Sequence, residues 1–292
     1  MIKNKRSELK SIDYLDAEKA NRAWWESHPM TYDWEKTLRI SPGTLQWFDE
    51  IDRRFLDSAY YATEVNGPAF GRFMKPEFLK GKRVLEIGCG MGTHAELLIR
   101  NKARLTAIDQ TTFAIDATRR RLALKQLEAD VLQQDAENLV FQKDAFDFVW
   151  SWGVLHHSNS TERCIDQIAR VLQPGGRLMM MVYYRPSLVY YLHCGLIRGI
   201  LMGHLLRQSL DDIYLDSTDG FHARVFSKPE LHNLLSGKFE NIRMTVVGVK
   251  GELYPIPRTR FKISLERHTP DWLATAVLGR LGSMIVVEAV RV

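Results

Sequence analysis

A short apolar segment followed directly by a glycine cluster constrains the fold of this chain more than any other feature. Residues 83–87 read RVLEI, residues 88–92 read GCGMG, and a helical pattern begins at Thr93. The pattern predicts a buried strand that ends in a tight turn and opens onto a helix. Glycines let a ligand approach the backbone, and the N–H groups at a helix start can meet a polar group. A glycine cluster alone does not identify that ligand.

From Lys82 onward, short apolar strands alternate with helical stretches, the pattern of a parallel sheet with crossover helices. We expect strands at 83–87, 104–109, 129–133, 146–151, 177–182, 241–249 and 284–290, and helices at 93–100, 112–126 and 161–171. Gln173-Pro174-Gly175-Gly176 is expected to stop the last of these helices before the fifth strand. The chain is therefore predicted to be an α/β protein with a seven-stranded, mostly parallel sheet and helices on both faces.

The chain is expected to divide into two parts. Residues 1–80 would form an N-terminal helical cap, with Ser41-Pro42-Gly43 separating two helices. Residues 81–292 would form the main domain, with a helical insertion at about 185–215 on the substrate side and a loop insertion at 251–280. A chain of 292 residues is long enough to bury a full core as one such domain.

The amino-acid composition excludes few classes of protein. Hydrophobic residues make up 45% of the chain and charged residues 26%, as in ordinary globular proteins. The net charge of +5 would suit a nucleic acid or an anionic membrane, yet many enzymes carry such a surplus without either partner. The charged N-terminus has no apolar core like that of a secretion signal, and the three cysteines form neither a disulfide framework nor a metal site. These features favour a cytoplasmic protein without a metal.

Carboxylates follow two of the predicted strands. Asp109 ends the second strand at the distance from Gly88 expected for an acceptor of ribose hydroxyls. Asp135 follows the third strand, where its carboxylate can accept a hydrogen bond from an exocyclic amine while Ala136 packs beside a purine. Because the carboxyl ends of parallel strands meet at one edge of a sheet, these side chains are expected to converge there.

The motifs VLEIGCGMGT, AIDQT, QQDAENL, FDFVWSWGVLHH and ARVLQPGGRL occur in this order over residues 82–183. Together they resemble the class I, Rossmann-like S-adenosylmethionine-dependent methyltransferases of the "type 11" group, which includes the ubiquinone and menaquinone enzymes. The resemblance implies methyl transfer from S-adenosylmethionine to a small molecule. It implies cofactor contacts by residues of the glycine loop, the strand ends and the N-terminal segment: Tyr32, Glu86, Gly88, Cys89, Gly90, Gly92, Thr93, Asp109, Gln110, Asp135, Ala136, Glu137, Ser151, Trp152 and Gly153.

Other ligand and acceptor classes fit less well. A nicotinamide fingerprint would place a third small residue where Thr93 stands. Residues 151–154 read SWGV, which is neither the Asn/Asp-Pro-Pro-Tyr run of nucleic-acid amine methyltransferases nor the carboxylate loop of metal-dependent catechol enzymes. We expect a hydroxyl on a bulky or hydrophobic metabolite as acceptor. Carbon or nitrogen methylation, or RNA or DNA modification, remain alternatives; the basic run Arg119-Arg120-Arg121 is expected to be a solvated helix face.

Two histidines are candidates for a catalytic base, since methyl transfer needs one only when the acceptor must lose a proton. His157 is the first candidate and His156 the second, because both follow the fourth strand. A structural role as cover of the cofactor is the alternative for each. His94 could contact the methionine carboxylate or cap its helix.

Aromatic residues on two segments are candidates for acceptor contacts. The run from Trp24 to Trp34 includes Trp25 and Tyr32, which either reach the site or anchor the N-terminal helices on the core. After the fifth strand come Tyr183, Tyr184 and Tyr190. The apolar segment 188–206 that follows is interrupted by Arg198, so we expect a lid first, a homodimer contact second, and weak association with a membrane surface third.

Overall fold

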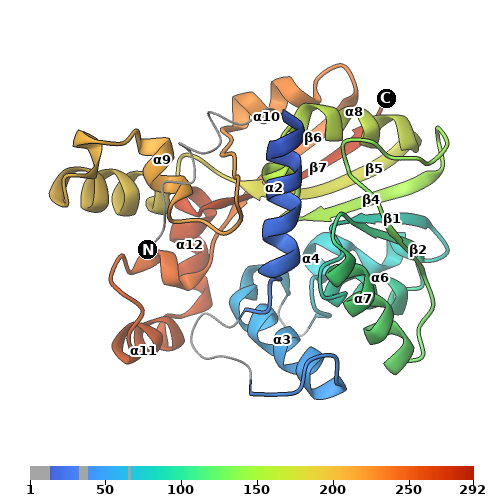
Figure 1. Ribbon diagram of the computed structural model, residues 1–292, viewed down its shortest axis with the longest axis horizontal. Helices are drawn as coiled ribbons and strands as arrows, with labels where there is room; N and C mark the ends of the chain where they lie inside the picture. The colour runs from blue at the N-terminus through green and yellow to red at the C-terminus, as the bar shows by residue number, and fades with distance from the viewer. Residues whose placement is uncertain (1–13, 33–38, 65–66) are drawn as a thin grey trace.

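The computed structural model describes residues 14–32, 39–64 and 67–292. Within these residues seven strands form one sheet, in the order β3-β2-β1-β4-β5-β7-β6 (Figure 1). The strands are β1 (Arg83–Ile87), β2 (Arg104–Asp109), β3 (Asp130–Gln133), β4 (Phe146–Trp152), β5 (Leu172–Tyr183), β6 (Phe239–Val247) and β7 (Met284–Arg291). β1 to β5 pair in parallel, and β7 runs antiparallel to β5 and β6. The predicted seven-stranded, mostly parallel sheet is confirmed.

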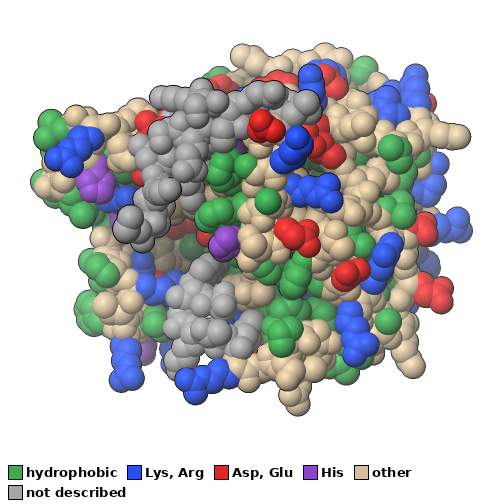
Figure 2. All heavy atoms as spheres, in the orientation of Figure 1, with side chains coloured by type: hydrophobic (Ala, Val, Ile, Leu, Met, Phe, Trp, Pro, Cys, Tyr) green, Lys and Arg blue, Asp and Glu red, His purple; other side chains and the backbone are tan. Residues whose placement is uncertain are grey.

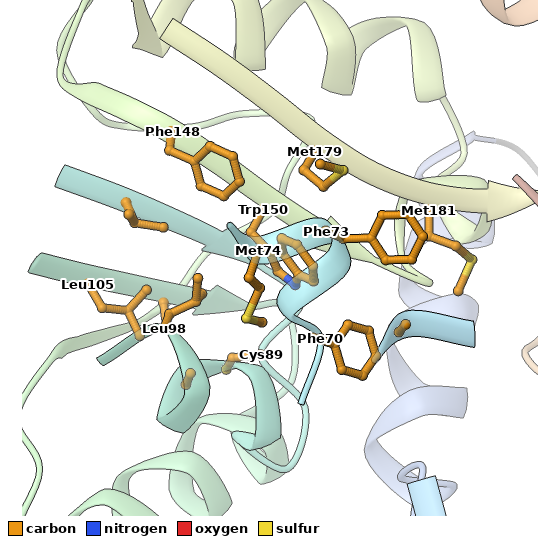
Figure 3. Close-up of a cluster of buried hydrophobic side chains, with 14 of the residues drawn as sticks. Phe70, Phe73, Met74, Cys89, Leu98, Leu105, Phe148, Trp150, Met179 and Met181 are labelled. Atoms are coloured by element: carbon orange, nitrogen blue, oxygen red, sulfur yellow. The ribbon is translucent and has the colours of Figure 1, made fainter. Parts of the chain in front are cut away.

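Alternation along the strands builds a core on each face of the sheet. Val84 of β1 and Phe148 and Trp150 of β4 pack on one face, where α6 (Thr93–Arg100) and α7 (Thr112–Leu124) lie. Figure 3 shows Trp150 near the centre of this cluster, with Phe148 on one side and Phe70 and Phe73 on the other. Leu85 and Val149 point to the opposite face, which α8 (Thr161–Val171) and α10 (Lys228–Leu235) cover.

The segment Gln173-Pro174-Gly175-Gly176 lies inside β5. The sequence pattern had predicted that it would come before this strand. α8 ends at Val171 as expected, but β5 pairs with β4 already at Leu172. The register then shifts between the pairs Phe146↔Leu172 and Phe148↔Arg177, which leaves the turn residues as a bulge. Glycine is required at 176, because a Cβ there would lie 2.7 Å from the carbonyl oxygen of Gln173.

The N-terminal helices lie against the main sheet. They are α2 (Tyr14–Ser27), α3 (Leu45–Ser58), η1 (Tyr60–Ala62), α4 (Gly71–Met74) and α5 (Pro76–Leu79). Thr44 caps α3 by accepting a hydrogen bond from the backbone N–H of Trp47, and α3 buries Phe48, Ile51 and Phe55. Trp34, at the end of the aromatic run, lies outside the described residues.

The expectation of a loop at 251–280 is wrong, because the segment folds into three helices. These are η5 (Lys250–Leu253), α11 (Arg260–His268) and α12 (Asp271–Leu281). Thr259 caps α11 by accepting from the backbone N–H of Lys262. No residue of α11 is buried. A helix that buries no face needs no apolar stripe, which is the signal that marks a helix in a sequence.

The insertion after β5 is helical as expected. It comprises a π-helix, η3 (Val189–Leu201), followed by η4 (His204–Leu206) and α9 (Leu210–Leu215). Tyr190 and Cys194 of η3 pack against Ile213 and Tyr214 of α9. In the described part of the chain, no helix combines the length and apolar character needed to cross a membrane.

Candidate functional site

A pocket of about 330 Å³ opens at the carboxyl edge of the sheet. The chain places β2 and β3 on one side of β1 and β4 and β5 on the other, so the strand order reverses between β1 and β4. Open α/β sheets bind ligands at such a switch point, beyond the carboxyl ends of the strands. Residues that follow β1, β2, β3 and β4 line the pocket, together with residues of α2 and the segment around Asp219.

The glycine loop forms the floor of the pocket. The backbone N–H groups of Gly88 and Cys89 both donate to the carbonyl of Ile108, at 2.8 and 3.0 Å, which ties the loop to β2. At Gly88 the backbone φ is +82°, and a Cβ would lie 2.2 Å from Cγ2 of Val154, so only glycine fits. At Gly90, with φ of +51°, a Cβ would meet no atom within 4 Å. Gly90 therefore leaves a cradle against which a ligand can lie.

Asp109 lies at the centre of the polar wall. Its Oδ2 accepts from the backbone N–H of Gly90 at 3.2 Å, and its Oδ1 accepts from the backbone and hydroxyl of Thr111 at 3.0 and 2.8 Å. Burial raises the pKa of this carboxyl, although these hydrogen bonds oppose the shift. Oδ1 already accepts two hydrogen bonds, so a ribose hydroxyl would bind at Oδ2 or replace one of these donors.

Asp135 and Glu137 both line the pocket, but their side chains make different contacts. Asp135 Oδ1 accepts from the backbone N–H of Glu137 at 3.0 Å, and its side chain lines the pocket. Glu137 also lines it, yet its Oε1 accepts from the hydroxyl of Ser158 at 2.7 Å and from the backbone of Ser160 at 2.9 Å. The Glu137 side chain therefore fixes the loop before α8.

The structure brings most of the predicted cofactor residues to the pocket. Its lining includes Tyr32, Gly88, Cys89, Gly90, Thr93, Asp109, Gln110, Asp135, Ala136, Glu137, Trp152 and Gly153. Glu86, Gly92 and Ser151 do not line it. The hydroxyl of Ser151 donates to the carbonyl of Ile87 at 3.3 Å beneath the loop, and Gly92 caps α6.

Glu86 is fully buried one layer below the pocket. Burial and the nearby charge of Asp109 hold the pKa of its carboxyl well above the usual range. Its Oε2 has no hydrogen-bond partner among the described residues. A buried acceptor without a partner costs free energy unless something supplies a donor, and an amino group or a bridging water held by a bound ligand would do so.

α2 crosses the open side of the pocket. The side-chain N–H of Asn21 donates to the carbonyl of His157 at 2.9 Å. The Glu26 carboxylate accepts from the backbone N–H groups of Thr112 and Phe113, at 2.8 and 3.0 Å, at the start of α7. A carboxylate at a helix N-terminus is favoured by the helix dipole. These contacts hold Trp25, which also lines the pocket, against the edge of the His157 ring.

The two candidate base histidines occupy different places. His157 lines the pocket, and its Nδ1 lies 2.7 Å from the carbonyl oxygen of His222. Since a carbonyl can only accept, Nδ1 carries the proton and the lone pair lies on Nε2. His156 does not line the pocket. Its ring packs on the ring of Tyr183, with the two ring centroids 3.9 Å apart. Burial holds the pKa of His156 well below the usual range.

One part of the pocket lining is aromatic and sulfur-rich. Tyr61, Met181 and Met284 line it with Tyr32 and Tyr183, and the Tyr61 hydroxyl contacts the sulfur of Met284 at 3.8 Å. Of the three predicted acceptor tyrosines, Tyr183, Tyr184 and Tyr190, only Tyr183, the last residue of β5, lies here. Tyr184 faces the other side of the sheet because successive strand residues alternate, and Tyr190 packs on α9 with its hydroxyl 2.5 Å from Asp211.

Several lining residues were not among those predicted. Glu18 and Asn21 of α2, Tyr61 of η1, and Asp219 reach the pocket only through tertiary packing. No local motif marks them. The predicted base and aromatic residues were found because they stand next to strand ends or in a dense aromatic run.

His94 lies among aromatic rings and makes no capping contact. The rings of Phe55, Phe70, Trp150 and Trp152 meet it edge to face with centroids 4.6 to 5.8 Å apart, and its Nε2 has no partner among the described residues. Burial, aided by the charge of Arg121, lowers the pKa of His94 to about 3. The folded protein therefore keeps this ring neutral where the unfolded chain would protonate it.

This pKa predicts a dependence of stability on pH. Because the folded pKa lies below the unfolded value of 6.5, the contribution of His94 is complete above pH 6.5 and is lost as pH falls toward 3. The loss is about 1.4 kcal/mol per pH unit in that window. His94→Phe should reduce the fall in unfolding free energy between pH 7 and pH 5 by about 2 kcal/mol, measured by guanidinium titration. Identical pH profiles would contradict a neutral, buried His94.

The polar groups around the pocket fit S-adenosylmethionine. The Gly90 cradle and the carboxylates of Asp109 and Asp135 line the pocket, and the unpartnered Glu86 Oε2 lies beneath it. This set of groups suits a nucleoside joined to an amino acid. In the described residues, no group of three His, Cys, Asp or Glu side chains is placed to hold a metal ion.

Comparison with known proteins agrees with this site. A methyltransferase-domain family model matches residues 85–180. The ubiquinone biosynthesis O-methyltransferase of Coxiella burnetii is 32% identical over 112 residues, which cover 38% of this chain and 48% of that protein. A mouse protein named probable tRNA methyltransferase 9B is 32% identical over 146 residues, covering 46% of this chain and 30% of its own.

The chain thus spans about half the length of the first curated relatives it matches. The protein solved in complex with the Trm112 methyltransferase activator of Haloferax volcanii has the same fold, with a TM-score of 0.51 and 16% identity over 85% of this chain and 95% of that one. Residues 85–180 therefore match the methyltransferase-domain family that the model describes.

Proposed function

We propose that this chain transfers a methyl group from S-adenosylmethionine to a hydroxyl on a bulky, hydrophobic small molecule. The carrying observation is the make-up of the pocket lining. It combines carboxylates that follow strands, Asp109 and Asp135, with apolar residues of one packed cluster, Tyr61, Tyr183 and Met284. We call these two groups the polar and the apolar end. An apolar, aromatic lining with few polar groups suits a hydrophobic metabolite.

The chain would hold the cofactor at the polar end. When bound, the cofactor supplies a methyl group on a positively charged sulfur. Asp109 would bind the ribose, Asp135 the adenine amine, and the Gly88–Gly92 backbone the amino acid portion. Transfer of a methyl group needs donor and acceptor in line, so much of the acceleration comes from positioning. α2, held by Asn21 and Glu26, keeps water from the open side.

His157 would act as the base at the junction of the two ends. The Nδ1–H bond to the carbonyl of His222 holds the imidazole in the tautomer whose Nε2 can accept a proton. An acceptor hydroxyl placed at this junction would give its proton to Nε2 as its oxygen takes the methyl group. Trp25 and Gly220 restrict the ring, since a Cβ at Gly220 would lie 2.7 Å from the imidazole.

His157→Asn should lower turnover about 10²- to 10⁴-fold, the usual contribution of a general base. The asparagine amide can still donate to the carbonyl of His222, so the loop should keep its structure. Cofactor affinity should change less than about twofold because His157 acts on the acceptor. Steady-state kinetics and calorimetry would measure the two effects. Unchanged kcat would leave positioning as the whole mechanism.

A second candidate, methylation of an amine, is favoured by Asp219. This carboxylate lines the pocket, and its charge adds to burial in raising the pKa of both Tyr32 and Tyr183. A carboxylate among aromatic rings suits a cationic amine. RNA or DNA modification has less support, because Arg121 of the basic run is buried and leaves only Arg119 and Arg120 on the surface.

A panel of acceptors tests the proposal. The protein is incubated with S-adenosylmethionine labelled in its methyl group and with hydrophobic phenols, the matching amines, and tRNA. Methyl transfer to phenols, with Asp219→Asn leaving the rate within about twofold, supports the proposed function. Preference for amines that Asp219→Asn abolishes supports the second candidate. Transfer to tRNA alone contradicts both.

A further inference from the structure

The segment that follows β5 meets the pocket later in the chain than predicted. No residue between 185 and 215 lines the pocket, so the expectation that residues 188–206 form a lid has no support in the part of the chain that the structure describes. The chain returns to the pocket at Asp219. We call residues 219–226 the strap, since they run from α9 to α10 beside α2 (Figure 1).

The strap contacts the imidazole of His157. The carbonyl oxygen of His222 lies 2.7 Å from Nδ1 of that ring. Gly220 lies against the ring as well, because a Cβ there would be 2.7 Å from Nδ1 and 2.8 Å from Cζ2 of Trp25. With a backbone φ of +84° and no room for a side chain, the strap needs glycine at this position. The place and the tautomer of the His157 ring therefore depend on where the strap lies.

Arg224 anchors the strap two residues beyond His222. Its backbone N–H donates to the carbonyl of His156 at 2.8 Å. Its guanidinium donates twice to the carboxylate of Glu162 in α8, from Nη1 to Oε2 and from Nη2 to Oε1, each at 2.8 Å. These hydrogen bonds lower the pKa of Glu162 to about 2, so the pair is charged at neutral pH. Two parallel hydrogen bonds fix the direction of the contact as well as its length.

A second cavity borders this part of the strap. Its volume is about 530 Å³, and its lining includes His222, Arg224 and Phe226 together with Glu162 of α8. It shares no lining residue with the pocket at the switch point. Close packing normally holds a segment in place, and an open space on one side removes part of that support. Hydrogen bonds and the ion pair therefore supply more of the restraint on the strap.

We propose that the ion pair of Arg224 and Glu162 positions His157 through the strap. Neither member of the pair lines the pocket, so both are positioning residues and not catalytic ones. The pair would keep the carbonyl of His222 in line with the Nδ1–H of His157, which leaves the lone pair on Nε2. This inference rests on the proposed function, in which His157 is the base.

Loss of the ion pair should leave the fold intact. The side chains of Arg224 and Glu162 are 33% and 53% exposed. Paired charges are common on the surface of this protein, since Figure 2 shows Lys, Arg, Asp and Glu side chains intermingled on the face that carries α2. Ion pairs between partly exposed side chains contribute little to stability. An effect of Arg224 on the rate would therefore report the position of the base and not unfolding.

Arg224→Gln tests the inference with the full chain and the best phenol of the acceptor panel. kcat should fall about tenfold, less than the roughly 10²-fold loss that a 1 Å displacement of a catalytic group can cause. KM for the phenol and Kd for S-adenosylmethionine should change less than about twofold. Glu162→Gln should lower kcat equally, and the double variant should lose no more than either single one, because the two side chains act as one unit. Arg224→Lys, which keeps the charge, should lose only about threefold.

Nitrogen-15 NMR of the imidazoles gives a second measurement that needs no acceptor. The signals of His157 are identified by their absence in His157→Asn. They should show the Nδ1–H tautomer in the unmodified chain, and a mixture of tautomers with faster Nδ1–H exchange in Arg224→Gln. Unchanged signals in Arg224→Gln would overturn the inference even where methyl transfer to phenols is found. Changed signals in a chain that methylates no phenol would support the strap and contradict the proposed function.

Arg53→Gln is the matched control. Arg53 donates twice to Glu50 within α3, with both distances 2.8 Å, and it is 59% exposed, so this pair has the same geometry at a site away from the strap. Its loss should leave kcat and the His157 signals unchanged. Gly220→Ala should alter both, because its Cβ would displace the ring directly. Equal losses of kcat in Arg53→Gln and Arg224→Gln would overturn the inference.

Discussion

Replacing Arg121 with methionine should lower the free energy of unfolding by about 3 kcal/mol. The Arg121 side chain is 1% exposed and joins three segments. Its guanidinium donates to Asp52 of α3 at 2.9 Å and to Glu96 of α6 at 2.7 and 2.9 Å. Burial would raise the pKa of Glu96, but hydrogen bonds from Arg100, Arg121 and Lys125 together lower it to about 2. Removing Arg121 leaves the carboxylates of Asp52 and Glu96 with less positive charge to offset their mutual repulsion.

The same network holds the glycine loop. The hydroxyl of Thr93 donates to Asp52 at 2.7 Å, and Arg121 donates to the carbonyl of Met91 at 3.4 Å. Arg121→Met should therefore also weaken cofactor binding. Arg120→Met is the matched control, since Arg120 is exposed and makes one contact of 3.3 Å with the carbonyl of Gly43. Guanidinium titrations that give equal stabilities for the two variants would contradict the role assigned to Arg121.

Asp109→Ala should raise the dissociation constant for S-adenosylmethionine by about 10²-fold or more. In the proposed function this carboxylate binds the ribose, and each hydrogen bond to a charged group contributes about 1.5–3 kcal/mol. The substitution also frees the N–H groups of Gly90 and Thr111 that Asp109 now accepts from. Part of the loss would therefore come from a less ordered loop.

Asp116→Ala is the matched control for Asp109→Ala. Asp116 lies on the exposed side of α7 and does not line the pocket. Calorimetry should give the same dissociation constant for this variant as for the unmodified chain. Equal affinity of the two alanine variants would show that the nucleoside does not bind at the end of β2.

Much of the fold could be predicted because local signals agree with the tertiary structure. β1 and β2 begin and end where the apolar pattern begins and ends. α8 starts where Ser160 caps it, and its apolar stripe buries Cys164, Ile165 and Ile168. α11 was missed because it lies on the surface without such a stripe. The bulge in β5 was read as a stop, since proline and glycine punctuate turns and bulges alike.

Arg121 was predicted to be solvated with its neighbours, and the structure shows it buried. Helical spacing could have found it. Ala114, Thr118 and Leu122 lie on the buried side of α7, and Arg121 falls on the same stripe while Arg119 and Arg120 do not. A run of three arginines hides the difference between Arg121 and its neighbours, because counting charges ignores the side of the helix on which each residue lies.

The site was predictable at the strand ends and not beyond them. Asp109 and Asp135 follow strands, so topology alone brings them together. Asn21, Tyr61 and Asp219 come from α2, η1 and the segment after α9, whose positions depend on tertiary packing. Alternation also separates Tyr183 from Tyr184, which the sequence could not do without the register of β5.

Calorimetric titration of the unmodified chain with S-adenosylmethionine tests the central claim most directly. The pocket at the switch point should bind one molecule per chain with a dissociation constant of about 1–100 μM, in the range of ordinary cofactor and substrate affinities. Binding to the folded state alone should also raise the unfolding temperature as the ligand concentration increases. No heat of binding, together with an unfolding temperature that stays constant up to millimolar ligand, would contradict the assignment of this pocket to S-adenosylmethionine.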